Sequence, residues 1–377
     1  MINRFFRSRI FFLALLLCSP ALSRAQQSSA PQASQSEPVL VVRPPSKPAE
    51  RPSVVTAEGR IHLDVLVSDA AGKPVLGLGP QDFTLLDNNQ PRRILSFRSY
   101  NGINVKPNPP VEVILLFDTL NLPFQEVSFT RQEIIKFLSQ NGGHLAQPVS
   151  LMLLTDHGLR IQPRPSVDGN ALVSVLDSIK GMVSTINPAM GSEGALERLQ
   201  LSLRQMSTIA ENEAGKPGRK LLIWIGPGWP MLDSNSFTFS DKDQVHYFDS
   251  IVELRSKLRE ARISVYSVSE PAPGLGDGPD RRFMYKDFLK GVQSPRQADT
   301  GNLALKVLAL QSGGRILGPD NDLAGQIDIC IAEANAFYTL SFTPPAAEHA
   351  NEYHDLKVQL SQPGLAARTS TGYYNQP

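Results

Sequence analysis

The stretch VEVILLFDTLN, residues 111–121, decides the fold class of this chain. Residues 111–117 form a continuous apolar run broken only by one Glu, as a strand buried on both faces of a sheet requires. Residues 124–138 follow with apolar side chains at helical spacing, namely Phe124, Val127, Ile134, Ile135 and Leu138. The stretch therefore predicts a buried strand followed by a helix, which is the repeating unit of an α/β sheet.

The same alternation of buried strand and helix recurs along the chain. Further strands are predicted at 149–154, 159–161, 221–225, 263–268 and 315–317. Helices are predicted at 168–180, 193–210, 243–261, 302–311 and 322–335. This order predicts an α/β fold with a mostly parallel sheet, right-handed crossovers and helices on both faces.

Sequence typical of β-strands brackets this body on both sides. Residues 61–67 alternate between apolar and polar, and short strand-like segments continue to residue 97. At the other end, residues 337–342, 353–360 and 366–373 also predict strands. Because small isolated sheets are marginally stable, we expect the two flanks to meet in one small β-sandwich-like unit. A wide separation of the two β ends would contradict this hypothesis.

The first 25 residues have the layout of a signal peptide. Three arginines precede an apolar run at 10–17, and small residues at the end suit cleavage after Ala25. The run is shorter than the roughly 20 residues that span a bilayer. A retained anchor is one alternative, and Cys18 raises a lipoprotein as another, although Leu17 stands where lipoprotein signals carry a small residue. We therefore expect an exported protein, periplasmic or secreted.

Composition and segment character predict the domain organisation and exclude some partners. The 37 basic and 36 acidic residues, with no run of Lys and Arg longer than two, argue against a nucleic-acid partner. No segment of the mature chain reaches membrane-spanning length, so no integral span is expected. After cleavage Cys330 stands alone, at an expected buried helix position. The predicted segments are a signal peptide at 1–25, a disordered spacer rich in Pro, Ser and Gln at 26–55, a β subdomain at 56–106, the α/β domain at 108–335 and the rest of the β subdomain at 336–377.

Several stretches together resemble a known family. Besides residues 111–121, these are VSDAAGKPV at 67–75, LGPQDF at 78–83, YHDLKV at 353–358, and Arg368 with GYY at 372–374. They are similar to the VWFA-related domain family of acidobacterial type, which is like the von Willebrand factor type A domain, over roughly residues 58–375. The resemblance implies a Rossmann-like, A-type sheet with one antiparallel edge strand between two layers of helices.

The resemblance also implies where a metal would bind. A-type domains usually hold Mg²⁺ with an Asp-x-Ser-x-Ser motif after the first strand, helped by a Thr and an Asp from later loops. Asp118 matches the first Asp, but Leu120 and Leu122 replace the two serines. Asn121 and Ser192 are the other candidate ligands, so the implied site is a degenerate metal-ion-dependent adhesion site (MIDAS). No cofactor is certain, and Mg²⁺ is the metal that such oxygen ligands would suit.

Asp118 has a second interpretation that needs no metal. The later Asp should follow residues 221–225, where the sequence instead has Gly226, Pro227 and Gly228. Asp118 would then cap the neighbouring helix or accept hydrogen bonds from loop amides. The alternative remains a metal-dependent ligand-binding protein or hydrolase built on Asp118.

No catalytic motif accompanies these features. The sequence lacks a nucleophile elbow, a dinucleotide fingerprint and a phosphate loop, and its six histidines show no His-x-x-x-His spacing. We therefore expect no enzyme but a module that binds a protein or peptide of the cell envelope through loops after the strands, at 118–124, 190–193, 226–237 and 271–282. The candidate contact residues are Thr119, Leu120, Trp229, Met231 and Phe237. For Trp229, packing under its own loop is the alternative.

Overall fold

The computed structural model describes residues 41–42, 59–102, 104–177, 191–231, 240–268, 284–318 and 320–377. The predicted signal peptide and most of the predicted spacer lie outside the described residues. The architecture below belongs to the compact unit Pro38–Pro377. The five-segment division of the chain stays a prediction.

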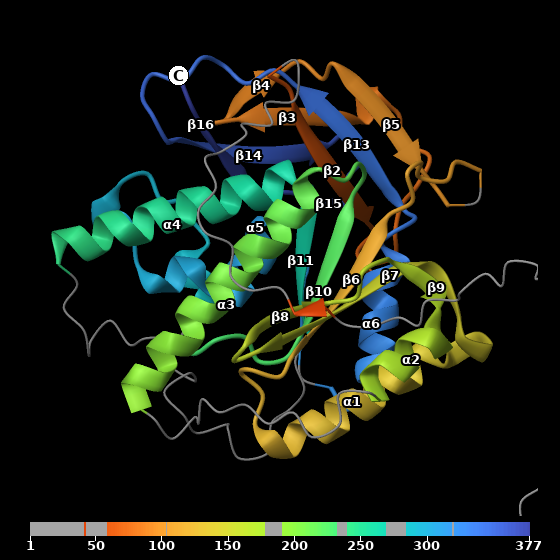
Figure 1. Ribbon diagram of the computed structural model, residues 1–377. Coiled ribbons are helices and arrows are strands. Elements are labelled where there is room, and N and C mark those ends of the chain that lie inside the picture. The colour runs from red at the N-terminus through yellow and green to blue at the C-terminus, as the bar shows by residue number, and fades with distance from the viewer. Residues whose placement is uncertain are drawn as a thin grey trace, which may run out of the picture. The chain divides into compact units, whose positions relative to one another are not determined.

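Eight described strands form the central sheet. They are β1 (Val41–Val42), β6 (Glu112–Asp118), β7 (His144–Thr155), β8 (Gly158–Ile161), β9 (Ser166–Asp168), β10 (Lys220–Ile225), β11 (Ile263–Val268) and β12 (Arg315–Leu317). Their order is β1-β8-β7-β6-β10-β11-β12, with β9 also paired to β7 (Figure 1). Pairing is parallel from β7 through β12, whereas β1, β8 and β9 pair antiparallel. The mostly parallel sheet is confirmed, and its edge carries more antiparallel strands than the resemblance implies.

Helices cover both faces of this sheet. They are α1 (Phe124–Leu138), α2 (Gly169–Asp177), α3 (Gly191–Ala214), α4 (Asp241–Glu260), α5 (Leu305–Gln311) and α6 (Leu323–Ala332). Side chains alternate along β6, so Val113, Leu115 and Phe117 join one core while Ile114 and Leu116 join the other. The first core packs against α1, α2 and α6, and the second against α3, α4 and α5. None of the described helices is both long and apolar enough to cross a bilayer.

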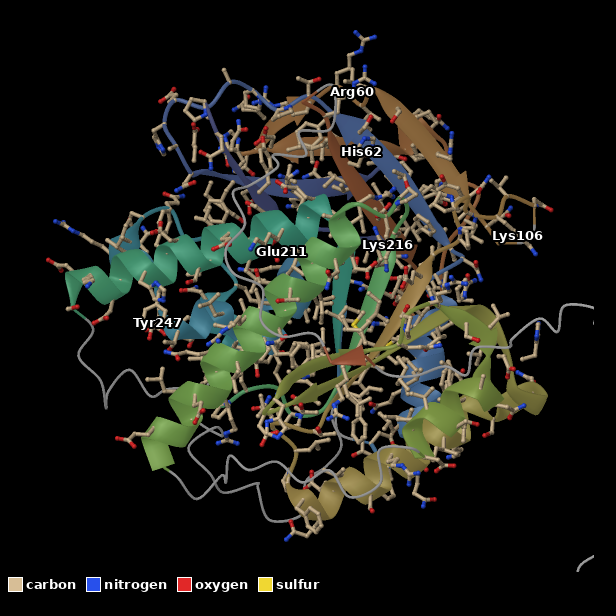
Figure 2. All side chains as sticks on the ribbon, in the orientation of Figure 1. Arg60, His62, Lys106, Glu211, Lys216 and Tyr247 are labelled. Atoms are coloured by element: carbon tan, nitrogen blue, oxygen red, sulfur yellow. The ribbon has the colours of Figure 1, made fainter. Side chains whose placement is uncertain are left out.

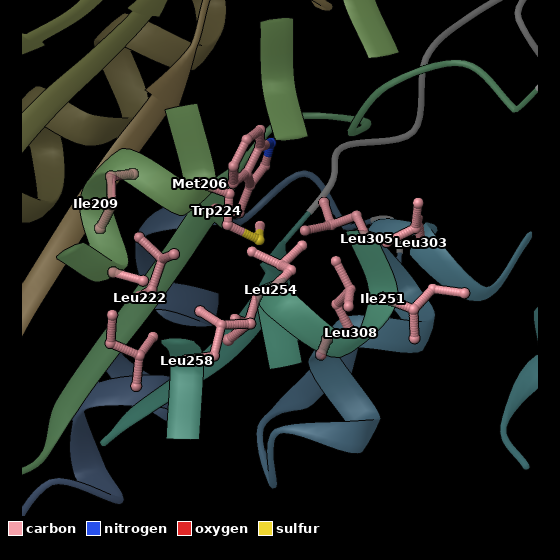
Figure 3. Close-up of a cluster of buried hydrophobic side chains, with 14 of the residues drawn as sticks. Met206, Ile209, Leu222, Trp224, Ile251, Leu254, Leu258, Leu303, Leu305 and Leu308 are labelled. Atoms are coloured by element: carbon pink, nitrogen blue, oxygen red, sulfur yellow. The ribbon is translucent and has the colours of Figure 1, made fainter. Parts of the chain in front are cut away.

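The two cores explain why the central strands are apolar on both sides. Leu222 and Trp224 of β10 lie against Met206 of α3 and Leu254 of α4 (Figure 3). Burying a large apolar side chain stabilises a fold by roughly 1.5–3 kcal/mol. On the other face Cys330 is buried as predicted, and burial raises the pKa of its thiol well above the usual range. That thiol is therefore a packing group rather than a nucleophile.

Two smaller sheets combine strands from the two ends of the chain. Their strands are β2 (Ile61–Ser68), β3 (Phe83–Asp87), β4 (Gln90–Arg92), β5 (Ser96–Tyr100), β13 (Phe337–Phe342), β14 (Glu352–Leu360), β15 (Ala366–Arg368) and β16 (Gly372–Asn375). Among the described strands the orders are β15-β2-β13-β5 and β16-β14-β3-β4. One apolar core contains side chains of both sheets, such as Leu63 and Leu340 from one and Leu85 and Leu356 from the other. Residues about 270 positions apart thus pair in β2–β13 and β3–β14.

The last predicted strand is in fact two strands. The sequence predicts one strand over residues 366–373, whereas β15 pairs with β2 in one sheet and β16 pairs with β14 in the other. Between them the Thr371 amide donates to the Gln311 carbonyl at the end of α5, over 3.1 Å. The Thr371 carbonyl accepts from the Leu356 N–H of β14 over 2.9 Å, so Thr371 joins the α/β body to the second small sheet, which apolar alternation alone could not reveal.

Candidate functional site

Asp118 ends β6 at the carboxyl edge of the parallel strands, where open α/β sheets usually bind ligands. Its side chain is fully buried. The Asn121 backbone N–H donates to Oδ1 over 3.0 Å, and the Asn121 Nδ2 donates to Oδ1 and Oδ2 over 3.1 and 2.9 Å. The indole Nε1 of Trp224 donates to Oδ2 over 2.8 Å. Both carboxylate oxygens are therefore engaged by N–H donors.

The electrostatics of Asp118 follow from this enclosure. Burial raises the pKa of Asp118 to about 6, while the hydrogen bonds from Asn121 and Trp224 act in the opposite direction and limit the rise. The ionised carboxylate is thus compensated by N–H dipoles. No group of three or more His, Cys, Asp and Glu side chains arranged to hold a metal occurs in the described part of the chain.

The described residues around Asp118 do not fit Mg²⁺. This ion takes oxygen ligands in a near-octahedral shell, whereas the groups that face the carboxylate are N–H donors. Leu120 and Leu122 are buried in the two cores, and the Thr119 hydroxyl donates to the Leu154 carbonyl over 2.8 Å. Ser192 belongs to the first turn of α3, and its side chain is not among those that the structure describes. Of the three predicted ligands, the structure brings Asp118 and Asn121 together, and Asn121 presents its amide nitrogen to the carboxylate. The buried Oδ1 of Asn121 has no hydrogen-bond partner among the described residues, and this single free oxygen beside Asp118 falls short of an octahedral shell.

The residues expected to contact a partner at this edge of the sheet differ in how far they are exposed. The expectation that Leu120 and Trp229 meet a partner needs correction, because they are only 2% and 5% exposed. Trp229 packs edge-on against Trp224, with ring centroids 5.2 Å apart, which is the alternative in which it lies under its own loop. Met231 is partly buried against the same core, and Phe237 lies outside the described residues.

Sequence reasoning missed the contributions of Trp224 and Gly226 to this cluster. An indole N–H inside an otherwise aliphatic buried strand needs an acceptor, and that need was the available signal for Trp224. Gly226 has φ +146°, and a Cβ added there would lie 2.9 Å from the Cβ of Asp118. The position that would supply a later metal ligand is therefore glycine because only glycine permits this close approach.

This arrangement leads to an expected result with divalent cations. We expect Mg²⁺ or Mn²⁺ at about 5 mM to shift the melting temperature of the chain by less than about 1 °C. The described residues form no oxygen shell that would bind either cation, and a cation that does not bind the folded state does not stabilise it. Differential scanning fluorimetry, compared with a buffer of equal ionic strength that contains EDTA and no divalent cation, measures this shift. A rise of several degrees that Asp118→Asn abolishes would contradict the assignment.

No protein-family model matches the sequence, and no curated protein matches it either. Manganese-loaded TRAP protein from Plasmodium vivax is a similar solved structure, at 8% identity and TM-score 0.33, covering 76% of this chain and 100% of that one. Human COPII-coat protein Sec24c has 10% identity and TM-score 0.30, covering 71% of this chain.

A third similar structure is the PilB minor pilin from Streptococcus sanguinis, at 13% identity and TM-score 0.32, covering 60% of this chain and 62% of that one. This chain spans 44% of the Sec24c chain, which is less than half of its length. Membership of the VWFA-related family therefore stays a prediction from the sequence, beside a mixed α/β fold that the strands and helices establish.

Proposed function

We propose that this chain is an exported, non-enzymatic module that binds a protein partner of the cell envelope through the exposed face of α1. Export is proposed from the layout of residues 1–25. The absence of an enzymatic role is proposed because the carboxylate of Asp118 is fully buried and its oxygens accept hydrogen bonds from neighbouring N–H groups. A buried carboxylate in this state has no access to a substrate.

The single observation that carries the proposal is an aromatic helix face with no charged residue among the exposed positions of residues 124–132. Lys136, the next exposed residue on this side, pairs with Glu133 and Asp322. Phe124 is 67% exposed and Phe129 is 46% exposed. At about 100° per residue, the exposed positions of the first turns fall within roughly 140° of one another. We call this set the α1 face, and its members are Phe124, Gln125, Ser128, Phe129 and Gln132. Interface cores are enriched in aromatic residues and depleted in charged ones, and the α1 face has that composition.

The α1 face starts directly after the Asp118 loop. The Asp118 carboxylate binds both the backbone and the side chain of Asn121, and Asn121 also donates to the Ser202 hydroxyl of α3 over 3.1 Å. These bonds hold the loop that leads into Phe124. The buried polar cluster therefore supports a rigid presentation of the α1 face, which reduces the entropy that a partner must overcome on binding.

Replacing both phenylalanines should weaken partner binding strongly. Burying each ring at an interface contributes roughly 1.5–3 kcal/mol, so Phe124→Ser with Phe129→Ser should raise Kd at least about 100-fold. The partner would first be captured in the source cells with a photo-crosslinking amino acid at position 125 or 132. Titration of the purified partner against each variant then measures Kd.

Val245→Ser is the matched control for this experiment. Val245 is 46% exposed, as Phe129 is, but lies on α4, which packs on the opposite face of the central sheet. This variant should bind the captured partner with unchanged Kd. If the double phenylalanine variant bound the partner with the same Kd as the wild type, the α1 face would not be the binding surface.

A further inference from the structure

A small polar cavity lies where the α/β body meets the β-sandwich strands. Its volume is about 40 Å³, and it shares no lining residue with the Asp118 cluster. The lining comes from the C-terminal half of α4, the start of β11, the end of α5, strand β2 and the segment between β15 and β16. His62, labelled in Figure 2, is the exposed lining residue on β2. By volume the cavity would hold roughly three waters, so it suits a small ion and excludes a nucleotide or peptide.

Three arginines give this cavity a positive lining. Arg255 and Arg259 lie one turn apart on α4, so helical spacing brings them to one side, and Arg262 lies beyond the end of α4 in the turn that leads into β11. The one carboxylate among the described lining residues belongs to Asp64, and its Oδ1 already accepts from Arg262 over 2.5 Å and from Thr339 over 3.0 Å. Outside the lining, Asp355 interacts electrostatically with Arg255, and Glu260 pairs with Arg259. The lining itself holds no carboxylate for these two arginines.

Arg255 is the most informative residue of the lining. It is 7% exposed, and neither Nη1 nor Nη2 has a hydrogen-bond acceptor among the described residues. Its guanidinium carbon lies 5.1 Å from the ring centroid of Tyr353 and 5.6 Å from that of Tyr374. Aromatic contacts of this kind use the face of a guanidinium and leave its N–H groups, which lie in the plane, for a paired contact with an oxyanion. Because a buried charge without acceptors is unfavourable, the site favours an anion that supplies them.

Arg259 provides a second donor and a route to solvent. Its Nε also has no acceptor among the described residues, and burial lowers the pKa of its guanidinium. Its side chain keeps 22% exposure, and its Nη2 reaches the Glu260 carboxylate over 3.3 Å at the surface. Ser264, also in the lining, adds a hydroxyl. An anion entering beside Arg259 would therefore meet donors of both arginines.

We propose that this cavity binds a small tetrahedral oxyanion of phosphate or sulfate size through Arg255 and Arg259. The group is either a free ion or the phosphate of a larger headgroup, since both present the same oxygens. The lining joins α4 to β2 and to the β15–β16 segment. A bound oxyanion thus links the α/β body to the sandwich strands and stabilises the folded chain. The proposal does not depend on the α1 face.

Titration of the full chain with inorganic phosphate tests this site. At a phosphate concentration ten times Kd, we expect the melting temperature to rise by about 3 °C above that in NaCl of equal ionic strength. Isothermal titration calorimetry measures Kd for the wild type, Arg255→Gln and Arg259→Gln. Each substitution should raise Kd at least about tenfold, because a charge-assisted contact is lost. Because Arg259 is partly exposed, Arg259→Gln should fold even if Arg255→Gln does not. Arg259→Gln alone is then sufficient to test the site.

Arg204→Gln is the control, because it removes an exposed arginine from α3 that does not line the cavity. It should bind phosphate as the wild type does. Sedimentation with phosphatidic acid vesicles, compared with phosphatidylcholine vesicles, separates the sources. If the chain binds phosphate but not the vesicles, the ligand of the cavity is a free ion. If it binds phosphatidic acid vesicles and Arg259→Gln abolishes that binding, the ligand is a lipid headgroup. The proposal is overturned if neither ligand binds, or if both cavity variants bind as tightly as the wild type.

Discussion

Asp118→Ala should lower the free energy of unfolding by about 3–5 kcal/mol. The substitution removes the acceptor for the Asn121 backbone N–H, the Asn121 side-chain amide and the Trp224 indole. A buried donor left without an acceptor costs about 1–3 kcal/mol, and the variant no longer bears the cost of burying the carboxyl, which offsets part of that sum. Urea unfolding at pH 8, followed by tryptophan fluorescence, measures the change. At that pH the wild-type carboxyl, with its pKa of about 6, is ionised.

Asp249→Ala is the matched control for this prediction. Asp249 is an exposed carboxylate on α4, so its removal should change stability by less than about 0.5 kcal/mol. A loss below about 1 kcal/mol for Asp118→Ala would mean that the donors around Asp118 find water or other acceptors. The cluster would then not be the support of the loop before α1 that is proposed for it.

Gly226→Ala should destabilise the chain by about 2–4 kcal/mol. The residue has φ +146°, which L side chains rarely adopt, and its added Cβ would lie 2.9 Å from the Cβ of Asp118. Backbone strain of this kind costs about 1–3 kcal/mol, and overpacking adds a similar amount. The shift of β10 away from β6 should also lengthen the Trp224–Asp118 hydrogen bond. Urea unfolding measures the loss, and near-UV circular dichroism reports the tryptophan environment.

Gly215→Ala separates this effect from a general effect of glycine replacement. Gly215 follows α3, and an added Cβ there meets no atom within 4 Å. It should be neutral within about 0.5 kcal/mol. In an Asp118→Gly background the nearest clashing atom is gone, so Gly226→Ala should then cost at least about 1 kcal/mol less, while the backbone strain remains. Equal costs in both backgrounds would show that Gly226 does not act through Asp118.

The candidate site was only partly open to prediction from the sequence. Asp118 and Asn121 are three residues apart, so their proximity followed from local geometry, and the interpretation that Asp118 binds loop amides is confirmed. Trp224 lies 106 residues further along the chain, and only the pairing of β6 with β10 brings its indole to the carboxylate. The burial of Trp229 likewise depends on the α3–α5 core that covers its loop.

The arginine cavity shows the same division. The four-residue spacing of Arg255 and Arg259 is visible in the sequence, but arginines on a helix are usually solvated. The burial of Arg255 depends on Tyr353 and Tyr374, which come from the last strands of the chain. A charge that sequence alone would assign to the surface therefore ends in the interior.

By itself, the sequence determined the central strands, most helices and the mixed α/β class, because those depend on apolar periodicity within short windows. It did not reveal the short edge strands β1 and β9, and β1 lies inside the predicted spacer. The run at 111–117 and the spacing at 124–138 are enough for β6 and α1. Only the tertiary structure decided which groups face Asp118, which aromatic side chains stay exposed on the α1 face and which arginines line a cavity. These contacts depend on strand order and helix packing, which bring together residues that are far apart in the chain. Strand order and helix packing produce no periodic pattern in the sequence from which the contacts could be predicted.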